Sequence, residues 1–474
     1  MENTRTVTKS PKDEIESLKS RNEYLEREIA ELTDQNRELQ DLINHHPITG
    51  LPIRRIMDRD LERLLKVSQG LNKKCAVIII RLDNSYAKIR NNRDRNKVLL
   101  YKTVLRIQEI EKDKVYQSDR VDEFFIIVDH LSNGDSVTKI AKRILSNIIV
   151  PHEPPAEDIS FGCHMGIAVF PDHASNKENL LASADIALTE SEKIGQGYMI
   201  YNDQIGNRYH EDIKIEKELA SAIHNSGFKQ FQLVYQPFVD TDHMIRGAEA
   251  LIRWKHPQLG NIPPSRFIPI AEESGDIRFI GHWTLYHACK HLSLWHKAGH
   301  KDIYISVNLS PSQFKQSDIV ERITGILASL KIKGKYLKLE LTEGTVMSDP
   351  EDAIIKMEEL RKHGIHISID DFGTGYSSLN YLKRFPISTL KIDKSFIDDL
   401  CININNQEIV KAIISMARNL RIETLAEGVE QQDQLSFLFG EGCEFIQGYF
   451  FSKPVPVKKF TQYLLKGAKL PYKE

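Results

Sequence analysis

The 474-residue sequence predicts an α/β protein in which a (β/α)8, TIM-like barrel is preceded by a smaller α/β domain and an N-terminal helical coiled coil. Three observations support this fold class. A heptad pattern of Ile and Leu runs through the first helix-forming segment. Apolar strand-like and amphipathic segments then alternate to the end of the chain. In the C-terminal part, polar residues follow the apolar segments one after another, as they do around a barrel mouth.

Length and composition indicate a folded protein of several domains. The chain exceeds the roughly 100–200 residues of one ordinary domain. We predict a flexible tail at residues 1–12, a coiled coil at 13–44, an α/β domain at 45–204 and the barrel at 211–474. The hydrophobic content of 41% and the charged content of 27% are typical of globular proteins. A net charge of -2 without basic blocks argues against a partner of duplex nucleic acid.

The cysteines and the hydropathy of the chain indicate the cellular compartment in which the protein is expected. The five cysteines are scattered and form no CxxC pair, so neither a disulfide framework nor a zinc site is indicated. No apolar run approaches the ~20 residues of a membrane span, and the polar first residues do not resemble a signal peptide. We therefore expect a cytoplasmic protein with single thiols and no membrane span.

Residues 13–44 carry four heptads without a break. Position a holds Ile15, Asn22, Ile29, Asn36 and Ile43, and position d holds Leu18, Leu25, Leu32 and Leu39. Ile at a with Leu at d favours two parallel strands, and Asn at a fixes their register. We therefore expect a parallel homodimer through residues 15–43. The alternative is a single helix packed on its own domain.

The second segment contains three apolar runs that predict buried strands, CAVIIIRLD, EFFIIVDHL and FGCHMGIAVF. Its first residues, HHPITGLPIRR, resemble the opening of GGDEF domains, the cyclic di-GMP synthases. The stretch FGCHMGIAVFPDHASNKENLLASADIALTESEKIGQG is similar to the end of the same domains. The resemblance covers residues 45–204 and implies the fold of that family.

This GGDEF-like domain departs from the family where its chemistry is expected. Arg120 and Val121 stand in place of two glycines, and only residues 122–124 of the signature remain. A β-branched Val does not readily adopt the positive φ that Gly permits. By the resemblance, Arg81 replaces a metal carboxylate, and its positive charge repels Mg²⁺. We expect a degenerate, catalytically inactive domain with a regulatory or dimerisation role, on which a protein partner could dock. GTP binding is left open.

The third segment contains eight apolar stretches that predict strands. They are FQLVYQPFV, GAEALIRW, IYISVNLS, LKLELTE, HISIDDF, TLKID, ETLAEGV and FIQGYF. Amphipathic segments separate most of them, such as EDAIIKMEELRKHG, in which the final Gly indicates a helix end. Eight strands that alternate with helices predict a (β/α)8 barrel.

Polar side chains recur at the ends of these predicted strands. They are Gln236, Glu249, Asn308, Glu340 with Glu343, Asp370 with Asp371, Lys391, Glu427 with Glu430, and Gln447. One strand-end Asp is usually a cap or a turn residue, but a mostly acidic series is not explained in this way. Converging carboxylates repel unless cations neutralise them, and oxygen ligands suit Mg²⁺ or Mn²⁺. The absence of His from the set argues against zinc. We expect two metals, with the adjacent aspartates among their ligands.

The whole third segment resembles the EAL family of cyclic di-GMP phosphodiesterases. The resemblance rests on GAEALIRWKHPQLGNIPPSRFIPIAEESG, VNLSPSQF, LELTEG, IDDFGTGYSSLNYLKRFPISTLKIDKSFI, LAEGVE and QGYFFSKP, in the family's order. The resemblance implies that the metal ligands are Glu249, Asn308, Glu340, Asp370 and Asp371, and that Lys391, Glu427 and Glu249 have catalytic roles. It also implies that Gln236, Arg253 and Gln447 contact the nucleotide or support the site. Glu343 would anchor the loop of residues 373–378.

The expected activity is hydrolysis of cyclic di-GMP to linear pGpG by two metal ions, which activate water and stabilise the leaving oxygen. Lys391 adds a positive charge where negative charge grows, and Arg253 suits phosphate contact. The alternative is a receptor that binds cyclic di-GMP without turnover and signals through the coiled coil. A protein that also synthesises cyclic di-GMP is disfavoured by Arg81, Arg120 and Val121.

Overall fold

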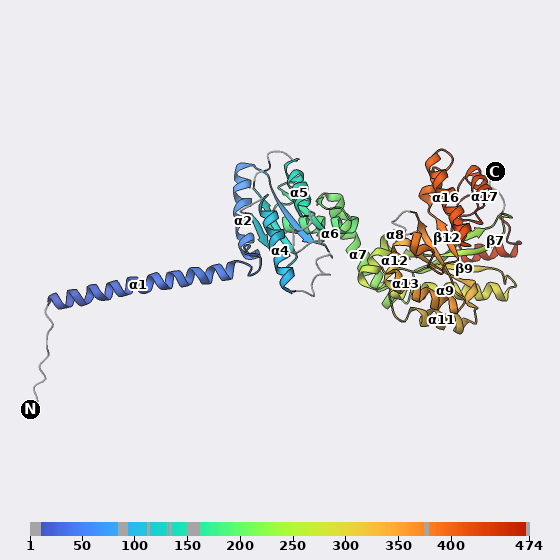
Figure 1. Ribbon diagram of the computed structural model, residues 1–474, viewed down its shortest axis with the longest axis horizontal. Helices are drawn as coiled ribbons and strands as arrows, with labels where there is room; N and C mark the ends of the chain where they lie inside the picture. Colours follow the sequence, from blue (N-terminus) through green and yellow to red (C-terminus); the bar gives the residue numbers. More distant parts are fainter. Residues whose placement is uncertain are drawn as a thin grey trace, which may run out of the picture. The chain divides into compact units, whose positions relative to one another are not determined.

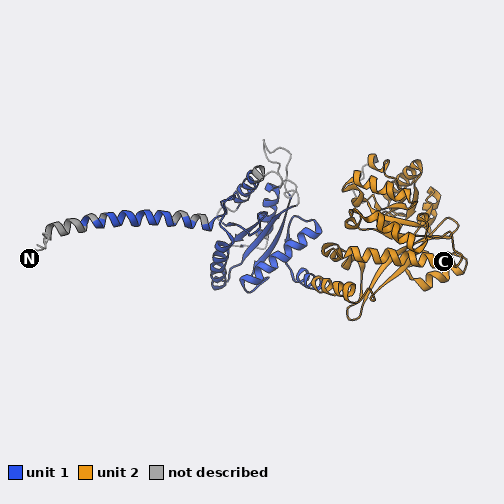
Figure 2. Cartoon of the chain, turned by 90° about the horizontal axis from the view of Figure 1, so that it is seen from below, with its two compact units in different colours: residues 1–211 blue, residues 212–474 orange. Residues whose placement is uncertain are grey.

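The structure is a computed structural model, which describes residues 11–83, 93–110, 114–129, 131, 135–148, 162–373 and 379–470. The chain forms two compact units, residues 1–211 and 212–474 (Figure 2). The boundary between them falls within helix α7 (Asp203–Ala220). Most of the predicted tail lies outside the described residues, but its last two residues already belong to the first helix.

Helix α1 (Pro11–Asn44) confirms the predicted helix and its end. The described Leu and Ile side chains of its seam are more than two-fifths exposed in the single chain; they are Leu25, Ile29, Leu32, Leu39 and Ile43. These side chains therefore do not pack on the described part of their own domain. An exposed row of Leu and Ile at heptad spacing is what a coiled-coil helix presents before it pairs.

The α/β domain of the first unit is built on a five-stranded sheet of order β2-β3-β1-β4-β5. Its strands are β1 (Cys75–Leu82), β2 (Val115–Gln117), β3 (Glu123–Val128), β4 (Cys163–Phe170) and β5 (Met199–Ile200), and its helices are α2 (Arg54–Leu71), α4 (Arg93–Gln108), α5 (Asp135–Ile148) and α6 (Lys177–Ile194). The three predicted strands are thereby confirmed.

The central strand β1 is apolar on both faces, which explains its unbroken hydrophobic sequence. Ala76, Ile78 and Ile80 belong to one buried cluster, whereas Val77 and Ile79 belong to another on the opposite face. Successive side chains of a strand point to opposite faces, so a strand covered on both sides requires apolar residues throughout.

The second unit is the barrel (Figure 1). Its strands are β6 (Phe231–Val239), β7 (Ile245–His256), β8 (Gly260–Ile262), β9 (Tyr304–Asn308), β10 (Leu337–Thr342), β11 (His366–Phe372), β12 (Thr389–Ile392), β13 (Glu423–Ala426), β14 (Phe445–Ile446) and β15 (Val455–Pro456). The eight predicted strands correspond to β6, β7 and β9–β14, while β8 and β15 are short additions at the edges.

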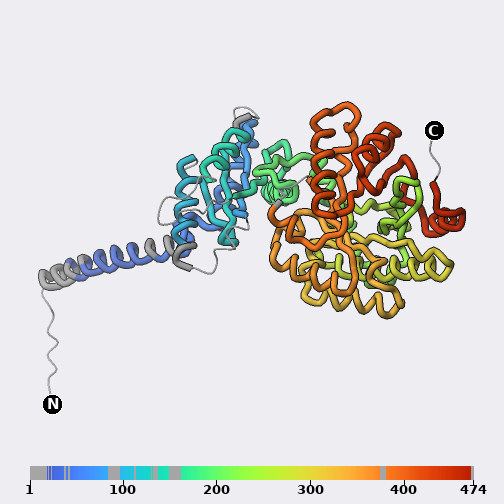
Figure 3. Tube along the Cα trace, turned by 45° about the vertical axis from the view of Figure 1, so that its right-hand side comes forward, coloured from blue at the N-terminus to red at the C-terminus, as the bar shows by residue number. Residues whose placement is uncertain are grey.

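Helices and helical turns separate most of the barrel strands (Figure 3). They are η1 (Ser221–Asn225), α8 (Pro264–Ser274), α9 (Ile277–Lys297), α10 (Pro311–Phe314), α11 (Ile319–Leu330), η2 (Gly334–Tyr336), α12 (Glu343–Met347), α13 (Pro350–Lys362), α14 (Leu379–Leu382), α15 (Lys394–Asp398), α16 (Ile404–Leu420), α17 (Gln432–Glu441) and α18 (Val457–Leu465). No helix in the described part of the chain has both the length and the apolar character that a membrane crossing requires.

Among the eight barrel strands one runs against the others, and two site residues, Gln236 and Glu249, stand inside their strands rather than at the expected strand ends. Strand β6 is antiparallel to both β7 and β14, whereas β7 and β9–β14 are parallel in succession. Gln236 consequently lies inside β6. The antiparallel register nevertheless pairs it with Glu249 of β7, so it reaches the same level of the barrel.

Alternation along the parallel strands places polar groups inside the barrel. Leu339 and Leu341 belong to the apolar core, while Glu340 between them points to the opposite side of β10. The register pairs Glu340 with Asn308 of β9 and with Ser368 of β11. The barrel interior is therefore polar near its carboxyl end, and this is where the candidate site lies.

Candidate active site

Lys391 of β12 lies at the centre of the polar interior. Its Nζ is 2.9 Å from Glu340 Oε2, 2.9 Å from Asp370 Oδ1 and 2.5 Å from Glu427 Oε1, and its side chain is 1% exposed. Burial alone would lower the pKa of this amine, but the attraction of the surrounding carboxylates outweighs burial and raises the pKa well above its ordinary value. Lys391 is therefore a fixed cation that connects three strands.

The acids around Lys391 outnumber it. Glu249, Glu340, Asp370, Asp371 and Glu427 supply five carboxyl groups to this end of the barrel, and the Lys391 ammonium group contacts three of them. Burial raises the pKa of Glu340 well above its usual range and that of Glu427 to about 8, although Lys391 opposes both shifts. Additional cations would relieve this surplus of buried negative charge.

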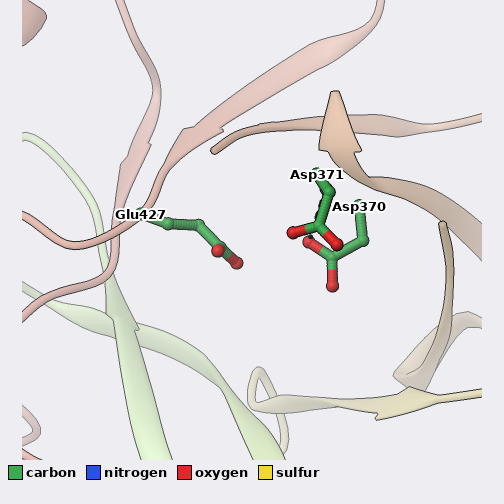
Figure 4. Close-up of side chains that lie close together, drawn as sticks. All are labelled: Asp370, Asp371 and Glu427. Carbon is green, nitrogen blue, oxygen red and sulfur yellow. Dashed lines mark hydrogen bonds between the residues drawn. The ribbon is translucent and has the colours of Figure 1, made fainter. Parts of the chain in front are cut away.

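Asp370, Asp371 and Glu427 form the group best placed to hold such a cation. One carboxylate oxygen from each lies within 4.8 Å of the other two, and in Figure 4 the aspartates face Glu427 across the mouth. Carboxylate oxygens are the ligands that Mg²⁺, Mn²⁺ and Ca²⁺ take in proteins. The donor set therefore fits a hard divalent cation.

A local irregularity explains why two consecutive aspartates face the same side. Side chains of adjacent strand residues normally alternate. In β11 the pairing with β12 shifts between Ile369 and Phe372, and Asp371 has a φ of 53°. A non-glycine residue in this left-handed region is uncommon. The bulge turns the second carboxylate toward the first, whose Oδ1 accepts a hydrogen bond from the Asp371 backbone N–H at 3.1 Å.

Glu249 is held by two amide side chains. Asn308 Nδ2 donates to one of its oxygens at 2.5 Å, and Gln447 Nε2 donates to the other at 2.6 Å. The same Gln447 nitrogen lies 3.2 Å from Gln236 Oε1, and Gln236 in turn donates to the Ser452 carbonyl at 3.3 Å. These hydrogen bonds fix the Glu249 carboxylate, so Gln447 and Gln236 support the site from behind this residue.

Glu343 begins α12 directly behind the aspartates. Its side chain is buried, and its Oε2 accepts a hydrogen bond from the Gly373 backbone N–H at 3.2 Å. Gly373 has a φ of 95°, and a Cβ there would lie 2.9 Å from the ring of Phe396, so only glycine fits. Glu343 thus holds the start of the predicted loop. The remainder of that loop, residues 374–378, lies outside the described residues.

Arg253 borders a cavity rather than the carboxylates. Its Nη1 donates to the neighbouring Ile252 carbonyl at 2.8 Å, and burial lowers its pKa although Glu249 opposes the shift. Together with Asn308 it lines a cavity of about 420 Å³ between β7, α8 and α9. This cavity could not be predicted from the sequence, because residues that form its walls, such as Ile268, resemble ordinary core residues of amphipathic helices.

Two further side chains belong to the site although the sequence reasoning did not include them. Ser306 donates a short hydrogen bond to Glu340. Asp393, just after β12, hydrogen-bonds to Asp371 and contributes, after burial and Asp370, to the raised pKa of that carboxyl. Asp393 follows a predicted strand directly, so the same strand-end rule could have found it. Ser306 lies within a strand and had no such signal.

The protein is thus a (β/α)8 barrel whose strand ends carry a buried lysine and an acidic group that could hold a metal ion. Comparison with known proteins identifies the family. Residues 216–454 match the EAL domain, and the chain belongs to the EAL domain family. Residues 43–197 match the domain described as "Diguanylate cyclase, GGDEF domain". The resemblance to a GGDEF domain followed by an EAL domain is thereby confirmed.

Two curated relatives come from Pseudomonas aeruginosa. The bifunctional diguanylate cyclase/cyclic di-GMP phosphodiesterase MucR is 34% identical over 90% of this chain and 62% of its own length. The cyclic di-GMP phosphodiesterase NbdA is 32% identical over 92% of this chain and 56% of its own length. The present chain therefore spans between half and two-thirds of these relatives.

A solved structure titled as the PaMucR phosphodiesterase in complex with c-di-GMP is also similar. It is 42% identical, covers 52% of this chain and 99% of its own chain, and superposes with a TM-score of 0.51. This similarity is to a phosphodiesterase described in complex with c-di-GMP.

Proposed function

We propose that this protein hydrolyses cyclic di-GMP to the linear dinucleotide pGpG with two divalent ions, Mg²⁺ or Mn²⁺. The observation that carries the proposal is the arrangement of Asp370, Asp371 and Glu427 around one point beside the buried Lys391. Relatives named as cyclic di-GMP phosphodiesterases support the choice of substrate.

Each side chain of the mouth has a role in this proposal. Glu249, Asn308, Glu340 and Asp370 would hold one metal, and Asp371 would hold chiefly the second. Bound metals supply activation of water and stabilisation of the leaving oxygen. Lys391 orients the attacking water and offsets the negative charge that grows on the phosphoryl group. Glu427, whose pKa burial raises to about 8, accepts the proton of that water in its ionised form.

The cavity beside Arg253 is the proposed position of one guanine base. Its volume of about 420 Å³ falls within the ~300–1,000 Å³ of small-molecule sites, and apolar residues of α8 and α9 form much of its wall. Arg253 and Asn308 both line the cavity, and Asn308 also donates to the Glu249 carboxylate. A base in the cavity would place its phosphate next to the metal ligands, with Arg253 free to turn toward it.

We further propose that the GGDEF domain of this chain is inactive as a cyclase and has a regulatory or dimerisation role. Arg81 at the end of β1 donates to Glu123 Oε2 at 2.6 Å and makes two bonds to Glu192, at 3.0 and 3.1 Å. The guanidinium group thus fills the space between these acids with its own positive charge. A divalent ion cannot approach the same carboxylates without displacing it.

The test of the main proposal is nucleotide turnover by the purified full chain. With Mg²⁺ or Mn²⁺ we expect cyclic di-GMP to disappear and pGpG to accumulate, and we expect Glu249→Ala to abolish the reaction. A metal chelator should stop turnover by the unchanged protein. GTP supplied in place of cyclic di-GMP should give no cyclic product. Tight binding of cyclic di-GMP without pGpG formation would favour the receptor alternative, in which the intact site binds but does not react.

A further inference from the structure

A second cavity lies at the amino-terminal ends of the barrel strands, on the face opposite the site. Its volume is about 500 Å³. Its walls come from the end of α13, the start of β11, the segment 382–388 and the end of α16. These elements meet at the end of the barrel away from Asp370 and Lys391, so this basal cavity is separate from the cavity beside Arg253.

The basal cavity lies beside an irregular stretch of chain that leads into β12. In a (β/α)8 barrel the helices cover the outside of the sheet. Residues 383–388 contain no helix, and Lys383 and residues 385–388 line the cavity.

The basal cavity joins an apolar floor to a basic rim. Phe385 and Ile422 are among the buried residues of its floor. Its charged lining residues are all basic or imidazole side chains, namely Lys335, Arg361, His366 and Lys383. No carboxyl group lines it.

Two of these cations have no acidic partner. Arg361 pairs with Glu358 on its own helix at 2.7 Å, and a cation near the end of α13 is also favoured by the helix dipole. Lys335 lies in the turn η2, and Lys383 follows the single turn of α14. In the described part of the chain, neither lysine forms an ion pair with a carboxylate. Lys335 Nζ lies 4.9 Å from the ring centroid of Tyr336, a contact that does not neutralise its charge.

We propose that this basal cavity is a second binding site, for a ligand with a planar aromatic ring and a phosphate group, of the size of a nucleoside monophosphate. The apolar floor would receive the ring, and Lys335 and Lys383 would contact the phosphate. The volume of the cavity lies within the ~300–1,000 Å³ typical of small-molecule sites. This inference does not depend on the reaction proposed for the carboxylates.

The same segment connects the basal cavity to the catalytic end. Leu382 and Phe385 line the basal cavity on one side and, on the other, a void of about 10 Å³ bordered by Glu343 and Phe372. Glu343 holds Gly373 at the start of the loop after Asp371. A ligand in the basal cavity would restrain segment 382–388 and thereby the packing behind Glu343.

The test is calorimetric titration of the full chain with guanosine 5′-monophosphate, in the presence of a metal chelator. Guanosine and ribose 5-phosphate serve as probes of the ring alone and the phosphate alone. We expect the nucleotide to bind at least about tenfold more tightly than either fragment, and Lys383→Glu to weaken its binding by about tenfold, since the ring and the phosphate both contribute. Lys301→Glu, an exposed lysine on the same face outside the cavity, is the matched control and should change the affinity less than about twofold.

Hydrogen exchange should locate the site independently of affinity. We expect the nucleotide to slow amide exchange in segment 382–388 and around Ile422. Glu249→Ala, at the catalytic end, should leave this binding unchanged. Binding that is lost in Glu249→Ala but kept in Lys383→Glu would place the nucleotide at the catalytic mouth and overturn the proposal. Absence of binding at millimolar nucleotide, or equal binding of ribose 5-phosphate, would also overturn it.

Discussion

Lys391 Nζ lies 2.9 Å from Asp370 Oδ1 inside the barrel, and only 1% of the lysine side chain is exposed. We expect Lys391→Met to lower the rate of cyclic di-GMP hydrolysis by about 10²–10³-fold, because a fixed cation beside the phosphoryl group is lost. Without metal, the variant should also melt at a lower temperature, because its buried acids lose their neutralising partner. Added Mn²⁺ should restore part of the lost melting temperature. Lys394→Met, at an exposed lysine three residues on, is the control; equal rates in both variants would contradict the role of Lys391.

The bond from Gly373 to Glu343 predicts a second effect. Glu343→Ala removes the acceptor at 3.2 Å and should reduce turnover by about tenfold, because the chain after Asp371 loses its support. Glu343→Gln retains an oxygen acceptor and should recover most of the activity. The metal concentration that gives half-maximal activity should rise in Glu343→Ala, which a purely structural role would not require. If the metal concentration for half-maximal activity were unchanged while the melting temperature fell, Glu343 would contribute to packing only.

Much of the fold and site could be predicted because parallel strands place their ends at one edge. Glu340, Asp370 and Lys391 follow apolar runs in the sequence, and the parallel register gathers them as expected. Gln236 and Glu249 instead lie inside β6 and β7, and nothing in an apolar strand states whether it runs with or against its neighbours. Only closure of the barrel between β14 and β7 sets the direction of β6.

The parts that the sequence did not reveal depend on precise backbone geometry and on packing. Two adjacent aspartates would alternate in a regular strand, and only the bulge at Asp371 turns both toward the mouth. The contacts of Lys391 with three acids depend on distances between four strands. The cavity beside Arg253 and the basal cavity arise where helices leave space, and apolar wall residues carry no mark that distinguishes them from core residues.

In the GGDEF domain, Arg81 should be more important for stability than Arg120. Arg81 is 17% exposed and binds Glu123, whereas Arg120 is 56% exposed and binds Asp122. We expect Arg81→Ala to destabilise the domain by about 2–3 kcal/mol, because Glu123 is left buried without its partner. Arg120→Ala should have an effect below about 1 kcal/mol. Hydrogen exchange of the β1 and β3 amides in the full chain measures the loss of stability in each variant. Equal protection of these amides in the two variants would contradict the greater importance of Arg81.

His291 of α9 predicts sensitivity of the barrel to acid. Its Nδ1 lies 2.6 Å from the hydroxyl of the buried Tyr235, and burial, with smaller contributions from His287 and Lys290, lowers the pKa of His291 to about 4 from its usual 6.5. Between these values the unfolded chain binds a proton that the folded chain does not, so the free energy of unfolding falls as pH falls from 6.5 to 4.

The variant His291→Gln tests this acid sensitivity. Gln retains an acceptor for the Tyr235 hydroxyl but does not titrate, so the loss of melting temperature between pH 7 and pH 5 should be smaller in this variant than in the unchanged protein. The difference between the two proteins isolates His291 from all other acid-sensitive groups. His282→Gln on the same helix, at an exposed position, should leave the acid sensitivity unchanged. Identical pH dependence in all three proteins would exclude the contribution of His291.

The exposed seam of α1 predicts the association state of the chain. Leu32 is 54% exposed and occupies a d position, where a parallel partner helix would bury it. We expect Leu32→Glu to convert a dimer into a monomer, as measured by light scattering after size exclusion, because two carboxylates would face each other in the seam. Ala30→Glu introduces the same charge two residues earlier, outside the seam, and should leave the dimer intact. A protein that is monomeric before substitution, or that stays dimeric with Leu32→Glu, would show that α1 does not pair in this way.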